Sequence, residues 1–252
     1  MNLDKWFPWY TRILSEFGFS REDDEKSAKL LNSLLEKQGC LKPSQIDIKD
    51  KVIIFGAGPS LKRNINELKV LNLGNFTFIA ADGATTALLE ENIIPNIIVT
   101  DLDGEMKDII KSNSEGAILA VHAHGNNIDK IEKYVPTLHE ILGTTQSVPL
   151  ENVYNFGGFT DGDRCIFLAI ELGAKYIVLA GMDFGKIVTK YSRPDLKNSL
   201  DNADSIKELK LKYAKDLTEW AEKNENVKLF NISKGEKLNG IPDIEAKNIL
   251  EL

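Results

Sequence analysis

The sequence has few of the residues that build disulfide-rich or zinc-clustered proteins. Its 252 residues include only 2 cysteines, Cys40 and Cys165, which lie far apart in the chain. Such a pair predicts neither a disulfide framework nor a cysteine-ligated zinc site, and two reduced thiols are the expected state. The expected compartment is therefore the cytoplasm.

Long apolar runs are absent as well. No hydrophobic stretch reaches the roughly 20 residues that a membrane-spanning helix requires. The opening stretch, MNLDKWFPWYTRIL, mixes charges with aromatic side chains and lacks the uninterrupted apolar region of a secretory signal peptide. We therefore expect neither a membrane association nor a cleaved leader.

An excess of positive charge is also missing, since the formal net charge is −7. Nucleic-acid-binding proteins usually present a basic face to the phosphates, so no nucleic-acid partner is expected. The hydrophobic content of 42 % and the charged content of 27 % are ordinary for a soluble globular protein. The length suits one large α/β domain with a small extension.

Residues 1–45 are predicted to form an N-terminal helical region. Leucines recur at helical spacing in Leu30–Leu35, Ser20 is a suitable N-cap, and Gly39 is a suitable C-cap. Residues 46–252 are predicted to form the catalytic domain, in which short apolar runs alternate with helical stretches.

The predicted strands of that domain are Val52–Phe55, Phe76–Ala81, Ile97–Thr100, Ala117–His122, Tyr176–Ala180 and Val227–Asn231. The predicted helices are Ile65–Leu71, Thr85–Asn92, Met106–Lys111, Asn127–Tyr134, Asp163–Leu172 and Ala203–Asn224. This alternation favours an α/β, Rossmann-like fold, with a mostly parallel sheet and helices on both faces. Ligands of such sheets bind beyond the carboxyl ends of the strands.

Three aspartates stand at predicted strand ends. Asp82 follows the run that ends at Ala81, and Asp101 and Asp103 follow the run that ends at Thr100. Residues i and i+2 of an extended segment point the same way, so Asp101 and Asp103 face one point. Carboxylates suit Mg²⁺, which takes hard oxygen ligands and leaves room for waters and phosphates. Each aspartate alone has the alternative of a helix cap or turn residue, but three together favour a magnesium–nucleotide site.

A glycine-rich turn, Gly56–Ser60, follows the first predicted strand. Its glycines let backbone N–H groups approach a phosphate at the start of a helix. Leu61 stands where a dinucleotide fingerprint has its third glycine, which disfavours an NAD site. The alternative is a plain strand-to-helix turn. The residues that we assign to nucleotide or substrate binding in these turns are Gly56, Gly58, Ser60, Asp82 and Gly83.

Two histidines, His122 and His124, end another strand with the spacing that lets both face one site. No cysteine or third histidine stands nearby in the sequence, which disfavours zinc ligation. We expect them to orient a phosphate or substrate, and the alternative is a structural pair.

The glycine-rich segment Gly157–Arg164 precedes a predicted helix and supplies Asp161, Asp163 and Arg164. A guanidinium forms bidentate contacts with phosphates. The alternative makes Asp163 a helix N-cap and leaves Arg164 on a solvated face.

The last predicted turn, Gly181–Gly185, is followed by the basic residues Lys186, Lys190 and Arg193. We expect Lys186 and Lys190 to contact phosphates in a loop that closes over a nucleotide, and the alternative is a solvated surface loop.

These motifs resemble those of a known family. The segments ADG, PNIIVTDLDG and FTDGDR are similar to the thiamin pyrophosphokinase pattern. The match to the archaeal 6-hydroxymethyl-7,8-dihydropterin pyrophosphokinases is closer, with GAGPSL, TDLDG, HAHG, GFTDGDR and GMDFG in order over about residues 51–193. Asn126 departs from the aspartate expected after HAHG, which argues against a catalytic or metal role there. Ala84 replaces the second glycine of the thiamin motif, which favours the pterin group.

The resemblance implies a Mg²⁺-dependent transfer of pyrophosphate from ATP to the hydroxymethyl group of the reduced pterin, with release of AMP. This step belongs to folate or tetrahydromethanopterin biosynthesis, and the thiamin relatives imply a homodimer. The implied metal ligands are Asp101 and Asp103, with Asp82 or Asp161 completing the site. The implied phosphate contacts are Arg164 with Lys186 or Lys190. The candidates for taking the hydroxyl proton are Asp161, Asp163 and His124.

Three other functions remain open at this point. The first is thiamin pyrophosphokinase. The second is a metal-dependent glycosyltransferase, because an Asp-x-Asp sequence at a strand end also binds nucleotide-sugars. The third is a nucleotide-binding module without catalysis.

Overall fold

An eight-stranded, fully parallel sheet organises the computed structural model, which describes residues 1–252. The strand order is β10-β7-β1-β2-β3-β4-β5-β6. The strands are β1 (Lys51–Phe55), β2 (Phe76–Ala81), β3 (Ile97–Thr100), β4 (Ile118–Ala123), β5 (Ile141–Thr145), β6 (Val153–Tyr154), β7 (Tyr176–Ala180) and β10 (Lys228–Asn231). A separate antiparallel hairpin joins β8 (Ile187–Thr189) to β9 (Leu200–Asn202).

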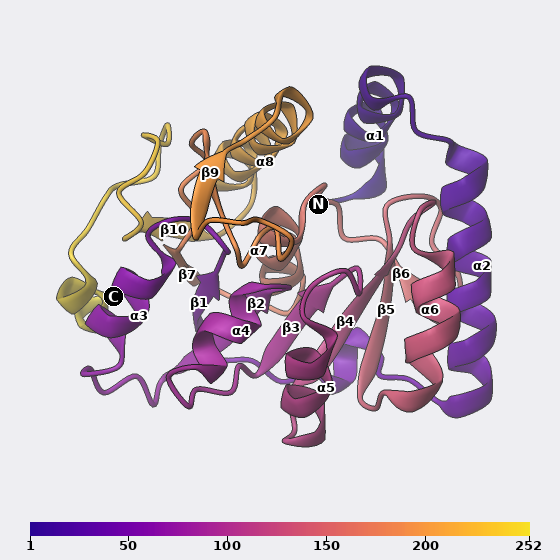
Figure 1. Cartoon of the computed structure of the whole chain (residues 1–252), viewed down its shortest axis with the longest axis horizontal. Helices are drawn as coiled ribbons and strands as arrows, with labels where there is room; N and C mark the ends of the chain where they lie inside the picture. Colours follow the sequence, from indigo (N-terminus) through magenta and orange to yellow (C-terminus); the bar gives the residue numbers. More distant parts are fainter.

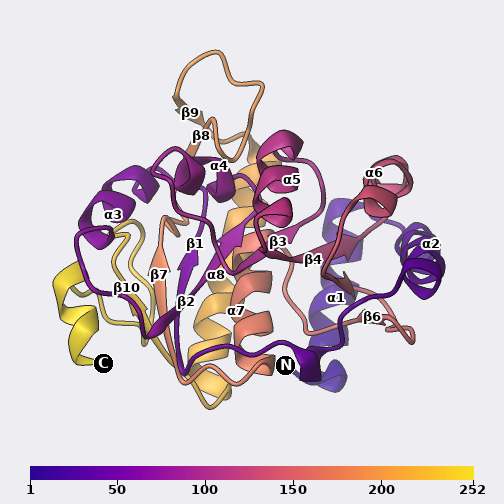
Figure 2. The ribbon, with the colours of Figure 1, turned by 90° about the horizontal axis from the view of Figure 1, so that it is seen from below.

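The helices form a layer on each face of this sheet (Figures 1 and 2). They are α1 (Leu3–Phe17), α2 (Arg21–Gln38), α3 (Leu61–Leu68), α4 (Ala84–Leu89), α5 (Met106–Ser114), α6 (Ile128–Tyr134), α7 (Asp161–Glu171) and α8 (Ser205–Asn224). Short 3₁₀ helices are η1 (Pro43–Gln45), η2 (Val135–Thr137) and η3 (Ala246–Glu251). Helices α1, α7 and α8 cover one face, and α3, α4, α5 and α6 cover the other. None of the helices has the length and apolar character needed to cross a lipid bilayer.

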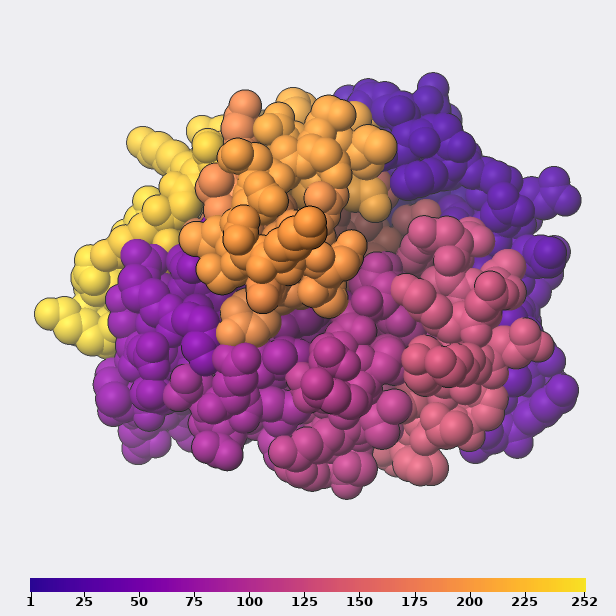
Figure 3. Space-filling view, in the orientation of Figure 1, coloured from indigo at the N-terminus to yellow at the C-terminus, as the bar shows by residue number.

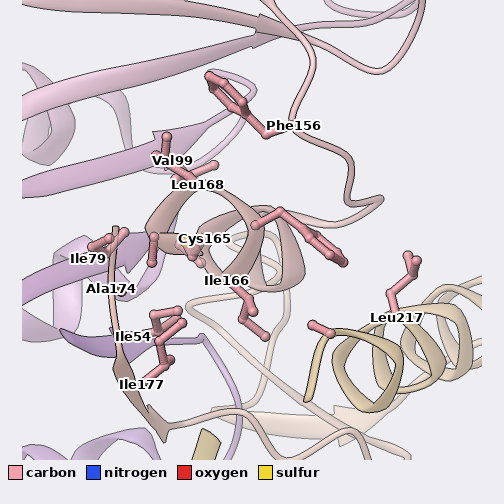
Figure 4. Close-up of a cluster of buried hydrophobic side chains, with 14 of the residues drawn as sticks. Ile54, Ile79, Val99, Phe156, Cys165, Ile166, Leu168, Ala174, Ile177 and Leu217 are labelled. Atoms are coloured by element: carbon pink, nitrogen blue, oxygen red, sulfur yellow. The ribbon is translucent and has the colours of Figure 1, made fainter. Parts of the chain in front are cut away.

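The strands are buried on both faces because their apolar runs supply two hydrophobic clusters at once. In β1, Val52 and Ile54 point into the cluster under α7, whereas Ile53 and Phe55 point into the cluster on the opposite face. Figure 4 shows Ile54 and other strand side chains facing α7, with Leu217 of α8 beyond it. The sheet is thus the central layer of a three-layer structure.

The predicted α/β fold is confirmed, and all six predicted strands are present. The strands β5 and β6 and the hairpin β8–β9 were not predicted. The sequence of β5 is Ile-Leu-Gly-Thr-Thr, which lacks the apolar run of the other strands although all five of its residues are buried. The strand β6 has only two residues, too few for any periodic pattern.

The helix ends depend on local capping. The predicted N-terminal helical region, residues 1–45, contains two α-helices, because Gly18 adopts a left-handed conformation with φ of 67° and ends α1. The predicted cap at Ser20 is confirmed, since its side chain accepts a hydrogen bond of 3.2 Å from the Asp23 amide. Helix α3 begins at Leu61, four residues before the predicted start at Ile65.

The N-terminal helices pack into the same two clusters as the sheet. Trp6, Tyr10 and Ile13 of α1 are fully buried in the cluster under α7. Leu31 and Leu35 of α2 are buried in the opposite cluster, where α2 covers the outer strands β5 and β6. Region 1–45 therefore contributes to the core on both faces.

This packing predicts that Leu31→Ala destabilises the whole protein. The substitution leaves a cavity in the cluster that the sheet shares, and we expect a loss of about 2 to 5 kcal/mol in the free energy of unfolding. Leu250→Ala is the matched control, because Leu250 is 47 % exposed and its loss is expected to cost less than about 0.5 kcal/mol. Urea denaturation of both variants measures the difference. A cost for Leu31→Ala as small as that of the control would contradict the shared core.

Candidate active site

A cleft of about 740 Å³ lies beyond the carboxyl ends of the strands. The turns that follow β1, β2, β3, β4 and β7 form its floor, as expected for a parallel sheet. Its walls come from the turn between α1 and α2, the start of α8, and the segment 187–195 around the hairpin β8–β9. Figure 3 shows this hairpin segment, in orange, as a raised part of the surface near the middle of the face in view.

The three aspartates Asp82, Asp101 and Asp103 meet on the floor of the cleft. Each offers a carboxylate oxygen, and these oxygens all lie within 4.8 Å of one another. The segment from Asp101 to Asp103 is a turn and not the extended chain that the sequence suggested, because Leu102 has a φ of 65°. The Leu102 side chain is buried, and its amide donates a 2.8 Å hydrogen bond to the Thr100 hydroxyl. The same hydroxyl donates to Asp82 and so holds both strand ends together.

The crowding of these carboxylates changes their pKa values. Burial, followed by the charges of Asp161, Asp101 and Asp103, raises the pKa of Asp82 well above its usual value. Desolvation in the cleft and the charge of Asp101 raise the pKa of Asp103 to about 6. Burial and the charge of Asp101 raise the pKa of Asp161 to about 8. The site therefore holds more carboxylates than it can ionise together at neutral pH without a cation.

Asp101 behaves differently because a histidine faces it. Burial alone would raise its pKa, but the hydrogen bond and charge of His124 outweigh burial and hold the pKa of Asp101 well below the usual range. The His124 Nε2 lies 3.0 Å from one Asp101 oxygen, Oδ2. The other oxygen, Oδ1, is buried and has no hydrogen-bond partner. A buried carboxylate oxygen without a partner is a free ligand position.

The two histidines have separate environments. His124 lines the cleft, whereas His122 is buried below it with its Nδ1 3.1 Å from the Thr144 hydroxyl. Burial and the charge of Arg164 lower the pKa of His122 well below its usual value, so this ring is neutral. The expected role at the site thus applies to His124 alone.

At the start of α7, two of the three residues predicted for the site in Gly157–Arg164 face the cleft and the third does not. Asp161 and Arg164 line the cleft and form an ion pair with an N–O distance of 3.1 Å. Asp163 lies in the helix cap, where it accepts hydrogen bonds from the amides of Phe159 (2.6 Å) and Thr160 (2.8 Å). The N-cap itself is Thr160 and not Asp163. The carboxylate of Asp163 is thus used by the capping box.

The glycine turn after β1 packs tightly against the turn after β7. The Gly58 amide donates to the Gly181 oxygen at 2.8 Å, and a Cβ at Gly58 would lie 2.6 Å from that oxygen. The Ser60 amide and hydroxyl both donate to Asp183, at 3.1 and 2.8 Å. A carboxylate of the chain therefore already occupies the N-terminus of α3. Gly56 and Gly58 line the cleft, but Ser60 does not.

The hairpin segment lies so close to position 83 that only glycine fits there. A side chain at Gly83 would collide with the backbone oxygen of Tyr191, which crosses directly above it. The Tyr191 hydroxyl donates to Glu90 at 2.7 Å, and the Thr189 hydroxyl donates to the Ala57 oxygen at 2.7 Å. The hairpin segment is thus anchored both to the end of α4 and to the turn after β1.

The basic residues of the cleft differ from those that the sequence suggested. Lys186 and Lys190 are exposed and do not line it, and the Lys186 side chain is 77 % exposed beside Glu208. The cationic residues that line the cleft are Lys130, Arg164, Arg193, Lys207 and Lys210. Lys207 and Lys210 are three residues apart at the start of α8, a spacing that places both on one helix face. Burial, followed by the charge of Lys207, lowers the pKa of Lys210.

Solved structures share the fold. The Maf glycosyltransferase of Magnetospirillum magneticum superposes with a TM-score of 0.59 at 16 % sequence identity. The match covers 91 % of this chain and 39 % of that protein. At this identity the likeness concerns the fold alone.

Curated relatives match over nearly their whole length. A 6-hydroxymethyl-7,8-dihydropterin pyrophosphokinase of Methanothermobacter thermautotrophicus is 54 % identical over 230 residues, which cover 91 % of this chain and 99 % of the relative. One of the same name from Pyrococcus furiosus is 46 % identical, covering 92 % of this chain and 100 % of the relative. The sequence profile of the MptE-like 6-hydroxymethylpterin diphosphokinases matches residues 25–189. The expected kinship is thereby confirmed, and the chain belongs to the MptE-like 6-hydroxymethylpterin diphosphokinase family.

Proposed function

We propose that the protein transfers the pyrophosphoryl group of ATP to the hydroxymethyl group of 6-hydroxymethyl-7,8-dihydropterin and releases AMP. The observation that carries the proposal is the convergence of Asp82, Asp101 and Asp103 in the cleft. It stands in a chain whose relatives, at 46 % and 54 % identity, are named for pyrophosphate transfer to this pterin.

The donor set of the cleft fits Mg²⁺. All three groups are carboxylates, and the buried Asp101 Oδ1 has no hydrogen-bond partner. Burial, followed by the repulsion of the neighbouring carboxylates, raises the pKa values of Asp82 and Asp103. Asp82, Asp101 and Asp103 would hold the ion. When bound, Mg²⁺ would neutralise charge on the phosphate oxygens, including the charge that develops on the departing AMP.

The chain's own cations would bind the polyphosphate. Arg164 is held beside the carboxylates by its ion pair with Asp161, so its guanidinium has a fixed direction. Lys207 and Lys210 line the same cleft, so we assign the phosphate contacts to them and not to Lys186 and Lys190. The reaction then depends on alignment of the hydroxyl with the phosphorus and on charge neutralisation.

Asp161 is the residue that we propose for accepting the hydroxyl proton. The oxygens of Asp163 are used in the helix cap, and the Nε2 of His124 is engaged by Asp101. The ion pair of Asp161 with Arg164 uses Oδ1 and leaves Oδ2 to accept the proton. Asp161 lines the cleft and has a pKa raised to about 8 by burial and by Asp101. A base whose pKa lies near the working pH is well suited to proton transfer.

The homodimer that the thiamin relatives imply stays a prediction.

Asp101→Ala and Asp103→Ala are each expected to reduce turnover by at least about 100-fold, because each removes a carboxylate that holds the ion. The measurement is AMP release from ATP with Mg²⁺ and the dihydropterin, with thiamin as the competing acceptor. Asp216→Ala is the matched control, since it removes a surface carboxylate of α8 that pairs with Lys212.

Full activity in either site variant would remove the metal assignment. AMP formed with thiamin and not with the pterin would replace the proposed acceptor. Release of UDP or CMP from a nucleotide-sugar, without AMP formation from ATP, would support the glycosyltransferase alternative.

The raised pKa values predict a pH-dependent stability without divalent cations. The folded-state pKa values of Asp103 and Asp161, about 6 and about 8, exceed the unfolded values near 4. Between about pH 4 and pH 8 the folded protein therefore binds more protons than the unfolded chain does. In EDTA the Tm is therefore expected to fall as the pH rises from about 5 to about 8. Added Mg²⁺ is expected to raise the Tm most at the alkaline end, because there it meets ionised carboxylates.

Thermal unfolding at three pH values, with EDTA and with Mg²⁺, measures both effects. Asp103→Asn serves as the control and should give a flatter pH dependence. A Mg²⁺ effect that shrinks as the pH rises would contradict the assignment.

A further inference from the structure

A buried carboxylate of the N-terminal region lies at the wall of the cleft. Asp24, in the first turn of α2, is 2 % exposed and accepts three hydrogen bonds. The donors are the Tyr10 hydroxyl at 2.7 Å, the Gln146 side-chain amide at 2.8 Å and the Gly125 backbone amide at 2.8 Å. Asp24 therefore joins α1, the segment after β5 and the turn after β4.

The partners of Asp24 are all neutral. A buried carboxylate without a cationic partner has a high desolvation cost, which here only hydrogen bonds and the N-terminus of α2 offset. Apolar side chains would serve equally well if these elements needed only packing. The specific property of the carboxylate is that it accepts hydrogen bonds and never donates them.

That property fixes the orientation of Gln146. An amide side chain donates through its nitrogen and accepts through its oxygen. Because Asp24 takes the nitrogen, the Gln146 Oε1 must point the other way, where it accepts a hydrogen bond from Arg164 at 3.3 Å. The Gln146 backbone oxygen is fixed as well, by a 2.8 Å hydrogen bond from the indole of Trp6.

The second branch from Asp24 reaches the histidine turn. The bond from the Gly125 amide holds the turn that carries His124, and His124 contacts Asp101 at 3.0 Å. A Cβ at Gly125 would lie 2.8 Å from the Cβ of Asp23, so the turn rests directly on the first turn of α2.

We propose that Asp24 is a positioning residue for the reaction. It orients Gln146 so that an acceptor faces the guanidinium of Arg164, and it holds the turn of His124 against the acidic cluster. The role of Arg164 in this inference rests on the proposed function, in which Arg164 binds the phosphates. Through Asp24, helix α2 then contributes to the geometry of the site as well as to the core.

Reversing the hydrogen-bond polarity tests the proposal. Asp24→Asn presents a donor to Gln146 and lets its amide turn its NH₂ group toward Arg164. Gln146→Glu places two carboxylates side by side. Each single variant is expected to lower kcat by about 10- to 100-fold, with a smaller change in the KM for ATP. The double variant Asp24→Asn/Gln146→Glu restores a donor–acceptor pair and an acceptor for Arg164, so its kcat should return to within about 3-fold of the wild type.

Tyr10→Phe is the matched control. It removes another hydrogen bond to the same carboxylate without changing the orientation of Gln146. We expect a Tm lower by a few degrees and a kcat within about 2-fold of the wild type. Asp24→Asn would resemble this control if Asp24 were only structural.

A readout that needs no turnover is the ¹⁵N NMR signal of the Arg164 guanidinium, assigned with Arg164→Lys. Because Nη2 is the atom that donates to Gln146, we expect slow Nη2–H exchange in the wild type and the double variant, and fast exchange in Asp24→Asn. This pattern without pterin-dependent AMP formation by the wild type would support the positioning role and refute the proposed function. A pterin-active wild type whose Asp24→Asn variant keeps both kcat and the Arg164 signal, or a double variant no better than the single ones, would overturn the positioning role.

Discussion

Electrostatic repulsion among carboxylates is the constraint on which the rest of this structure depends. Three aspartates at the floor of the cleft place carboxylate oxygens within 4.8 Å of one another, and Asp161 lines the same cleft. Like charges at this separation in a partly desolvated cleft repel each other strongly. The fold therefore has to hold Asp82, Asp101 and Asp103 against a force that would separate them, and its layers, turns and helix caps meet that need.

The restraint comes from short connections between neighbouring strand ends. The Thr100 hydroxyl links Asp82 to the turn after β3, and His124, in the turn after β4, contacts one oxygen of Asp101. The cluster under α7 and the cluster on the opposite face make the sheet stiff, so these connections start from fixed positions. The hairpin β8–β9 then crosses so close above Gly83 that no side chain fits there.

Much of this site was predictable from the sequence because parallel strands place their carboxyl ends at one edge. The apolar runs before Asp82 and Asp101 identify two such ends, and the meeting of these residues follows from the topology alone. The roles of Asp163 and Ser60 were not predictable, because a capping aspartate and a catalytic one have the same letter. Only the three-dimensional contacts show that Asp163 is the capping-box partner of Thr160 and that Asp183 accepts the hydrogen bonds of Ser60. The cationic residues Lys207 and Lys210 were missed because they reach the cleft from a helix distant in sequence.

The two margins of the sheet have a consequence for assembly. Helix α2 lies along β6, where its Asn32 accepts a 2.9 Å hydrogen bond from the Asn152 amide. At the other margin, Asn231 of β10 pairs with the C-terminal segment through Pro242 and Ile244. Covered margins offer few unpaired backbone groups to another chain, which protects a sheet from edge-to-edge growth. Two copies of this chain would therefore associate through helices or loops and would not extend the sheet across a symmetry axis.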